Sequence, residues 1–157
     1  MREMLIEWLK LKEISRQGWV LKGVKSPESV AAHSWSMALL ALTLCPQHLD
    51  LHKVLSMCLI HDLGEIVIGD LTPHDDLTHK LEREREGFKS IAEMYLPLFD
   101  EYEKGETEES KFVKKMDKLD MALQSRRYEE IGDVDLSEFR ASADQYLHST
   151  SFQSLYN

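Results

Sequence analysis

The sequence has few of the features that mark secreted, fibrous or membrane proteins. It contains two cysteines and four prolines among 157 residues, and we find no repeat and no low-complexity segment. No apolar run is as long as a membrane span, and the stretch Met1–Trp8 carries two acids where a signal peptide would be apolar. Cys45 and Cys58 lie in apolar stretches, so we expect reduced, buried thiols and a cytoplasmic protein.

Positive charge is also scarce. The chain has 19 Lys and Arg against 28 Asp and Glu, a net charge of −9. This sign disfavours nucleic-acid polymers and anionic membrane surfaces as partners. An anionic small molecule would need a metal or a few cationic side chains to reverse the charge of its site locally. The length and the 43% hydrophobic content fit one domain over residues 1–157 with a real core.

Convincing strand patterns are missing, whereas helical periodicity runs through most of the chain. Apolar spacings of three and four predict a helix near Met4–Leu9 and a second one after the start signal Ser26–Ser29, ended by Pro46. Further helices are expected over 51–68, 78–96 and 110–130, and another over the tail. We expect Pro97 to end the helix over 78–96 and the acidic stretch 101–109 to form a solvated turn or a frayed helix end. The predicted fold class is all-α, a single compact helical domain.

The pair His61-Asp62 is the most informative motif. It directly follows four residues of low polarity, Met57 to Ile60, and Glu65 comes three residues after it. Burying an imidazole beside a carboxylate is costly unless a charge compensates them, and a divalent transition metal suits this donor pair. Glu65 is spaced to share one helical face with the pair. Asp70 follows at the expected helix end, where the chain can turn its side chain back.

Two more candidate ligands lie on other predicted helices. His33 falls on the apolar stripe of Val30 and Met37, so it faces the core. Asp117 and Asp120 lie three residues apart on a later helix, beside core positions. Singly, each has an ordinary interpretation, because a histidine on an apolar face is often a hydrogen-bonded core residue and an aspartate on a helix is often solvated. The joint arrangement favours a metal site.

Four ordered motifs resemble those of a known family. They are Arg16–Trp19, Pro27–Ser34, His61–Glu65 with Gly69-Asp70, and Asp117–Asp120 with Gln124. Over about residues 11–128 the chain resembles the HD-domain metal-dependent phosphohydrolases, in particular their 5'-deoxynucleotidase-like branch.

The resemblance implies roles for individual residues. The metal ligands would be His33, His61, Asp62 and Asp117, binding one divalent cation such as Co²⁺ or Mn²⁺. Glu65 and Asp70 would be catalytic, through the water, the leaving group or a proton transfer. Arg16 would contact the phosphate, and Trp19 and Thr72 would help to bind the nucleotide. A homodimer is also implied, to which the apolar tail residues Phe152, Leu155 and Tyr156 would contribute.

The leading hypothesis is therefore a phosphomonoesterase that hydrolyses (deoxy)ribonucleoside 5'-monophosphates to nucleoside and phosphate. An HD-type phosphodiesterase keeps the metal but changes the substrate, and it is disfavoured by the single predicted metal site. A non-catalytic helical module with a structural metal is the third possibility. Glu65 and Asp70 argue against it, because a closed structural site needs no extra acids. Two tryptophans, Trp8 and Trp35, are expected in the core, while Trp19 suits a pocket or plain packing. The loop histidines His74 and His79 are expected to face solvent.

Overall fold

The computed structural model describes residues 1–72, 78–132 and 134–156. These residues form helices without a strand, apart from one isolated antiparallel bridge between Ser15 and Ser29. The elements are α1 (Arg2–Trp8), η1 (Leu9–Lys12), α2 (Gln17–Leu21), α3 (Val30–Leu44), α4 (Leu51–Ile60), α5 (Glu65–Ile68), α6 (Lys80–Ala92), η2 (Glu93–Tyr95), α7 (Leu96–Lys104), α8 (Glu108–Ile131), α9 (Ser137–Leu147) and η3 (Gln153–Leu155). The expected all-α class is confirmed.

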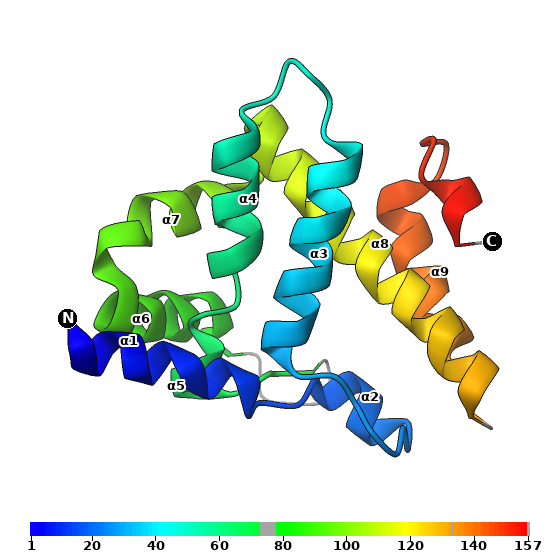
Figure 1. Ribbon diagram of the computed structural model, residues 1–157, viewed down its shortest axis with the longest axis horizontal. Helices are drawn as coiled ribbons and strands as arrows, with labels where there is room; N and C mark the ends of the chain where they lie inside the picture. Colours follow the sequence, from blue (N-terminus) through cyan, green and yellow to red (C-terminus); the bar gives the residue numbers. More distant parts are fainter. Residues whose placement is uncertain (73–77, 133, 157) are drawn as a thin grey trace.

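The long helix α8 organises the fold. It packs against α3 and α4 along one part of its length and against α9 along another, and α7 contacts it as well. Figure 1 shows α8 running diagonally behind α3, with α9 and the C-terminus to one side and α1, α6 and α7 grouped at the opposite end. None of the helices in the described part of the chain is long and apolar enough to cross a membrane.

The buried side chains form two apolar clusters. The larger lies among α3, α4, α8 and α9 and includes Met37, Met57 and Leu119. The smaller includes Val30, Phe88 and other residues from η1, α6 and α7. On α3, Val30 belongs to the smaller cluster and Met37 to the larger, and each lies one helical turn from His33. The predicted ligand His33 thus lies where the two clusters meet.

Several predicted helix boundaries differ from the observed ones. The helix expected over 51–68 is two helices, α4 and α5, separated by the turn 61–64. Pro97 occupies the first turn of α7 and so begins a helix, which fits its lack of a backbone N–H. The stretch 101–109 is therefore not one solvated turn: its first four residues belong to α7, and Thr107 caps α8.

Some predicted core positions are also wrong. Trp35, expected in the core, is 65% exposed. Trp8 is half-buried, and its indole N–H donates to the Ile91 carbonyl at 3.0 Å. In the tail, Tyr156 is buried against its own chain, with its hydroxyl 2.5 Å from Asp144 Oδ1. The two cysteines are free, as expected. His79 is exposed, as expected, whereas His74 lies outside the described residues.

Candidate active site

The first candidate ligand, His33, is placed by the start of α3. Ser29 caps this helix, its side chain accepting the Ala32 N–H at 3.2 Å, and the Val30 N–H donates to the Ile14 carbonyl at 2.8 Å. His33 follows one turn later and is completely buried. Its Nδ1 lies 2.7 Å from Asp120 Oδ2 on α8. Burial and Arg16 oppose a charge on the ring, but Asp117 and Asp120 outweigh them and raise the pKa of His33 to about 9 when no metal is bound. When the ring is neutral, the carboxylate of Asp120 accepts the Nδ1 proton and the lone pair lies on Nε2.

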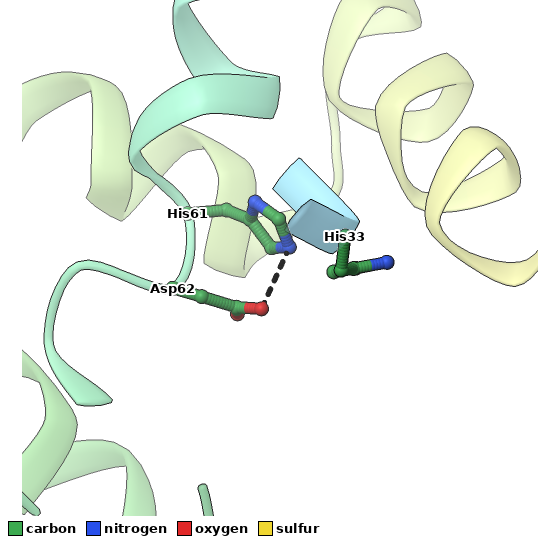
Figure 2. Close-up of side chains that lie close together, drawn as sticks. All are labelled: His33, His61 and Asp62. Atoms are coloured by element: carbon green, nitrogen blue, oxygen red, sulfur yellow. Dashed lines mark ion pairs between the residues drawn. The ribbon is translucent and has the colours of Figure 1, made fainter. Parts of the chain in front are cut away.

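The second and third candidates lie on the turn that follows α4. His61 Nδ1 lies 2.9 Å from the Cys58 carbonyl. A carbonyl can only accept, so Nδ1 carries the proton and Nε2 again carries the lone pair. His61 Nε2 lies 3.1 Å from Asp62 Oδ2. Figure 2 shows these two side chains meeting beside His33, which comes from a different helix.

A cation fits the space between these atoms. Ligand atoms of His33, His61 and Asp62 all lie within 4.8 Å of one another, and Asp117 Oδ1 is 3.3 Å from His33 Nε2. Ligands about 2.1 Å from a metal at ordinary coordination angles lie roughly 3.0–3.4 Å apart. The distances His61 Nε2–Asp62 Oδ2, 3.1 Å, and His33 Nε2–Asp117 Oδ1, 3.3 Å, fall in this range.

Unpaired polar atoms support the same fit. Among the described residues, four buried side-chain atoms make no hydrogen bond, and they are His33 Nε2, His61 Nε2, Asp62 Oδ2 and Glu65 Oε2. Without an ion, His33 Nε2 and His61 Nε2 lie 3.3 and 3.1 Å from carboxylate oxygens of Asp117 and Asp62, within ion-pair distance but without a hydrogen bond. A buried polar atom without a hydrogen bond costs about 1–3 kcal/mol, so a cation among these atoms would stabilise the site. Two imidazole nitrogens and two carboxylates suit a borderline divalent metal. The four ligands predicted from the sequence therefore lie close together. That they bind a metal stays a prediction.

Electrostatics at the site favour charged carboxylates at Asp62 and Asp117. Burial alone would raise the pKa of Asp62, but His61, Arg16 and His33 outweigh burial and lower it. For Asp117, burial is likewise outweighed by Lys118 and His33, so its pKa lies well below the usual value. Lys118 Nζ is 2.9 Å from Asp117 Oδ2, which leaves Oδ1 turned toward His33.

Glu65 has the opposite character. It is the first residue of α5, and burial raises its pKa to about 11, assisted by the negative charges of Asp62 and Asp70. A cation bound at the neighbouring ligands would oppose this shift, because it favours the charged carboxylate. In the metal-free protein Glu65 therefore holds a proton, whereas carboxylates are usually ionised. A group of this kind is suited to proton transfer.

Arg16 supplies positive charge beside the acids. Its Nη1 lies 3.5 Å from Asp62 Oδ2, and its backbone N–H donates to the Glu28 carbonyl at 3.0 Å. Burial opposes the charged guanidinium, but the surrounding carboxylates, Asp62 first, raise its pKa and keep it protonated. Asp70 Oδ2 accepts the Gln17 N–H at 2.6 Å and so fixes the start of α2 next to the acids.

All of these side chains except His33 line one cavity of about 440 Å³. The predicted residues that line it are Arg16, Trp19, His61, Asp62, Glu65, Asp70, Thr72 and Asp117. His33 lies behind them, fully buried. Trp19 combines both of its expected roles, because it is 1% exposed, packs in the core and still borders the cavity.

Asp120 is a supporting residue that sequence reasoning noticed without assigning a role. It is buried, and with Glu28 and His33 it forms a second group of close ligand atoms. In this group Glu28 Oε1 accepts the Trp19 indole N–H at 3.0 Å, and Asp120 is bonded to His33 Nδ1. These contacts explain the buried acids without a second ion. Other residues that line the cavity were not predicted from the sequence, among them Tyr102, Met121, Phe139 and Ser142.

Comparison with known proteins decides the family. Residues 9–155, nearly the whole chain, match the HD domain family. The chain belongs to the HD domain family. This HD domain is similar to the bovine protein named 5'-deoxynucleotidase HDDC2, with 36% identity over 133 residues that cover 78% of the chain and 64% of the relative. The chain thus spans slightly less than two-thirds of the length of that curated relative.

Solved structures agree with the fold. A conserved hypothetical protein from Pyrococcus furiosus is 39% identical and superposes with a TM-score of 0.83, covering 94% of each chain. A protein from Magnetospirillum magnetotacticum described as a predicted metal-dependent phosphohydrolase is 32% identical, with a TM-score of 0.73 over 93% of this HD domain and 79% of that chain. Together with the converging ligand atoms, these likenesses imply a divalent metal as the cofactor.

Proposed function

We propose that this HD domain is a metal-dependent phosphomonoesterase that hydrolyses (deoxy)ribonucleoside 5'-monophosphates to nucleoside and phosphate. The observation that carries the proposal is the group of four unpaired, buried side-chain atoms beside a cavity that also holds a charged arginine. The names of curated relatives, 5'-deoxynucleotidases, support the substrate class and a 2'-deoxy sugar. We also propose that residues 1–157 act as one phosphohydrolase domain.

His33, His61, Asp62 and Asp117 would hold the cation. Their two nitrogens and two carboxylates favour Mn²⁺ or Co²⁺ over the oxygen-preferring Mg²⁺. A divalent cation bound there supplies a water of lowered pKa and offsets the charge of the phosphate. Asp120 and the Cys58 carbonyl hold the two imidazoles in the tautomer that turns Nε2 toward the cation.

Arg16 is proposed to bind the substrate phosphate. Its planar guanidinium offers paired N–H donors that match two phosphate oxygens. Asp62, Asp70 and Glu65 keep it charged, so an incoming dianion meets a fixed positive group in a chain of net charge −9. Asp70 orients this arginine by bonding the next backbone N–H along the chain.

Glu65 is proposed as the proton donor to the 5'-oxygen of the leaving nucleoside. It is half-buried at the start of α5, and in the metal-free protein burial of its carboxyl group raises its pKa. Giving up that proton as the P–O bond breaks avoids release of an alkoxide, a contribution typically of ~10²–10⁴ in rate. We propose that Asp70 and Thr72, which line the same cavity as Trp19, contact the sugar.

The alternative functions fit the geometry less well. A two-metal phosphodiesterase would need a second ligand cluster, and among the described residues the second group shares His33 and already has its hydrogen bonds. A purely structural metal leaves the unpaired Glu65 and the open cavity without a role.

The direct test measures phosphate release. Purified protein, stripped of metal and reloaded with Mn²⁺ or Co²⁺, is given a panel of ribo- and deoxyribonucleoside 5'-monophosphates, 3'-monophosphates and a cyclic dinucleotide. We expect metal-dependent release from the 5'-monophosphates and none from Asp62→Ala. Cleavage of the cyclic dinucleotide alone would support the phosphodiesterase, and no release from any ester would refute both enzymes.

We further propose a homodimer in the cytoplasm. Trp35, Leu39 and Leu42 are exposed at spacings of four and three on α3, so they form one apolar stripe that a second copy can cover. The free thiols Cys45 and Cys58 suit a reducing compartment. Light scattering during gel filtration is expected to give twice the chain mass, reduced to one chain by Leu39→Glu but not by Ile131→Glu, which changes an exposed residue at the end of α8.

A further inference from the structure

Glu28 is a half-buried acid that the proposed chemistry does not use. It lies between α2 and α3 and is not among the described residues that line the cavity. Its backbone N–H donates to the Tyr128 hydroxyl of α8 at 2.7 Å, and its carbonyl accepts the Arg16 N–H at 3.0 Å. Its carboxylate accepts the indole N–H of Trp19 on α2 at 3.0 Å. Glu28 therefore bonds both α2 and α8.

The backbone around Glu28 joins the start of α2 to the start of α3. Ser15 and Ser29 form the one isolated antiparallel bridge of the described chain. Beside this bridge lies the hydrogen bond from the Arg16 N–H to the Glu28 carbonyl. Val30, which follows the bridge, is the first residue of α3. The arginine proposed to bind phosphate is thus fixed against the helix that carries a proposed metal ligand.

The carboxylates of Glu28 and Asp120 lie close together but bond different partners. Ligand atoms of Glu28, Asp120 and His33 all lie within 4.8 Å of one another. Asp120 Oδ2 lies 2.7 Å from His33 Nδ1, whereas Glu28 Oε1 accepts the Trp19 indole N–H. The hydrogen bonds therefore connect Asp120 to the proposed metal site and Glu28 to the wall of the cavity.

Trp19 needs an acceptor in this position. The residue is 1% exposed, and its ring packs 4.2 Å from the Phe139 ring and 5.4 Å from the Tyr128 ring, centre to centre. An indole N–H buried among rings is costly unless an acceptor meets it. Trp19 borders the cavity, and Arg16 is the N-cap of the same short helix. A change in the position of this indole would therefore alter the side of the cavity that α2 forms.

We infer that Glu28 is a positioning residue that keeps Arg16 and Trp19 in place for the nucleotide and does not support the metal. The inference rests on the proposed function for the identity of the ligand and deepens it by separating the tasks of two neighbouring acids. A buried donor left unpaired shifts an equilibrium by roughly 5- to 100-fold. Glu28→Ala should therefore weaken nucleotide binding by about this factor and leave Mn²⁺ binding unchanged.

The first measurement follows Trp19 directly. Nuclear magnetic resonance of protein with isotope-labelled tryptophan, loaded with diamagnetic Zn²⁺, gives one indole N–H signal for each tryptophan. Glu28→Ala should shift the Trp19 signal and speed the exchange of its proton with water. Glu28→Gln, whose amide oxygen still accepts the hydrogen bond, should retain most of the protection. The Trp8 indole, which donates to the Ile91 carbonyl, is the internal control and should not change.

The second measurement separates nucleotide binding from metal binding. Glu65→Gln protein loaded with Mn²⁺ is titrated calorimetrically with deoxyadenosine 5'-monophosphate, and Mn²⁺ affinity is measured by competition with a chelating dye. In this background we expect Glu28→Ala to weaken only nucleotide binding and Glu28→Gln to weaken it less. Asp120→Ala should weaken Mn²⁺ binding. The matched control is Glu101→Ala, at a half-buried glutamate that bonds Thr107 away from the cavity, and it should change neither affinity.

The outcomes separate this inference from the proposed function. Unchanged exchange of the Trp19 proton in Glu28→Ala overturns the positioning role, as does unchanged nucleotide binding or a loss of Mn²⁺ affinity in that variant. A loss in Glu28→Gln as large as in Glu28→Ala overturns it too, because the acceptor is still present. The wild-type chain is assayed in parallel for phosphate release. Absence of release, while Glu28→Ala still weakens nucleotide binding alone, refutes the esterase and leaves the positioning role standing.

Discussion

Glu65 is the residue whose environment differs most from that of an ordinary carboxylate. Burial and two neighbouring aspartates raise its pKa to about 11, and its Oε2 makes no hydrogen bond. Because Glu65 is not one of the four proposed ligands, its role can be tested separately from metal binding. Replacing a proton donor should lower turnover but not metal content, whereas replacing a fifth ligand should lower both.

We predict that Glu65→Gln lowers kcat by ~10²–10⁴ while the bound metal per chain stays the same. The amide keeps the size of the side chain but cannot release a proton to the leaving oxygen. Turnover is measured as phosphate release and metal content by atomic emission. Glu106→Gln, a change at an exposed glutamate, is the control. Full turnover in Glu65→Gln, or a joint loss of metal and turnover, would contradict the assignment.

Asp120 acts through His33 and not on the substrate. It accepts the Nδ1 proton at 2.7 Å and thereby fixes both the ring orientation and the tautomer. We predict that Asp120→Ala weakens Mn²⁺ binding about 10- to 100-fold, and that Asp120→Asn, whose amide oxygen still accepts a hydrogen bond, weakens it less. Competitive titration against a chelating dye measures the dissociation constant.

Asp144→Asn is the matched control, since Asp144 bonds the Tyr156 hydroxyl at the C-terminal end of the fold. An unchanged affinity in Asp120→Ala would remove the positioning role. A loss of equal size in Asp120→Asn and Asp120→Ala would indicate that the charge of Asp120, rather than its hydrogen bond, supports the metal.

At the scale of elements, the turn between α4 and α5 decides where the candidate catalytic groups point. A continuous helix over 51–68 was expected from its apolar pattern, because a short break inside a run of apolar residues leaves the period almost unchanged. The break between α4 and α5 depends on contacts with α6, which the sequence of 51–68 alone does not reveal. Gly64 and Gly87 face each other where α5 meets α6, with the Cβ position of Gly87 3.4 Å from the Gly64 carbonyl.

We predict that Gly64→Ala destabilises the protein by about 1–3 kcal/mol. The added Cβ would lie 2.9 Å from the Glu84 carbonyl oxygen, which belongs to the backbone of α6 and cannot rotate away. Urea denaturation followed by circular dichroism gives the free energy of unfolding. Glu86→Ala, at an exposed position of α6, should stay within about 0.5 kcal/mol of the wild type. A Gly64→Ala protein as stable as this control would show that α5 and α6 can separate freely.

Other helix boundaries show what local patterns can and cannot predict. Val30, His33 and Met37 were placed on one buried stripe, and all three are buried, because a fifteen-residue helix repeats its pattern over several turns. Pro97 was misplaced because proline both ends one helix and begins the next, and only the packing of α7 on α8 selects between them. Trp35 was misplaced because an aromatic residue favours burial, while the local sequence does not show which face of α3 meets the rest of the fold.

For the whole molecule, the convergence of distant residues was predictable from ordered motifs and not from periodicity. The resemblance named His33, His61, Asp62 and Asp117, and these come together from α3, the turn after α4, and α8. Met121, Phe139 and Ser142 were missed because apolar and small residues on a helix carry no local mark of a binding role. Only the docking of α9 on α8 and α2 brings them to the cavity.

The same convergence predicts that metal stabilises the whole fold. The unpaired nitrogens of His33 and His61 and the acids beside them are buried at the junction of the two apolar clusters, so folding without a cation leaves them uncompensated. A ligand that binds only the folded state at 100 times its Kd adds about 2.7 kcal/mol. For a chain of this size that corresponds to a rise in Tm of roughly 5–10 °C.

Scanning calorimetry after treatment with EDTA and after saturation with Mn²⁺ measures this rise. We expect Asp62→Ala to lose it, because a ligand is gone, and Glu65→Gln to keep it, because Glu65 lies outside the ligand group. The contrast between these two variants is more informative than the size of the rise in Tm. An ion bound nonspecifically at the acidic surface would raise the Tm of both variants equally. Equal shifts in the two variants would therefore place the stabilising ion somewhere other than between α3, α4 and α8.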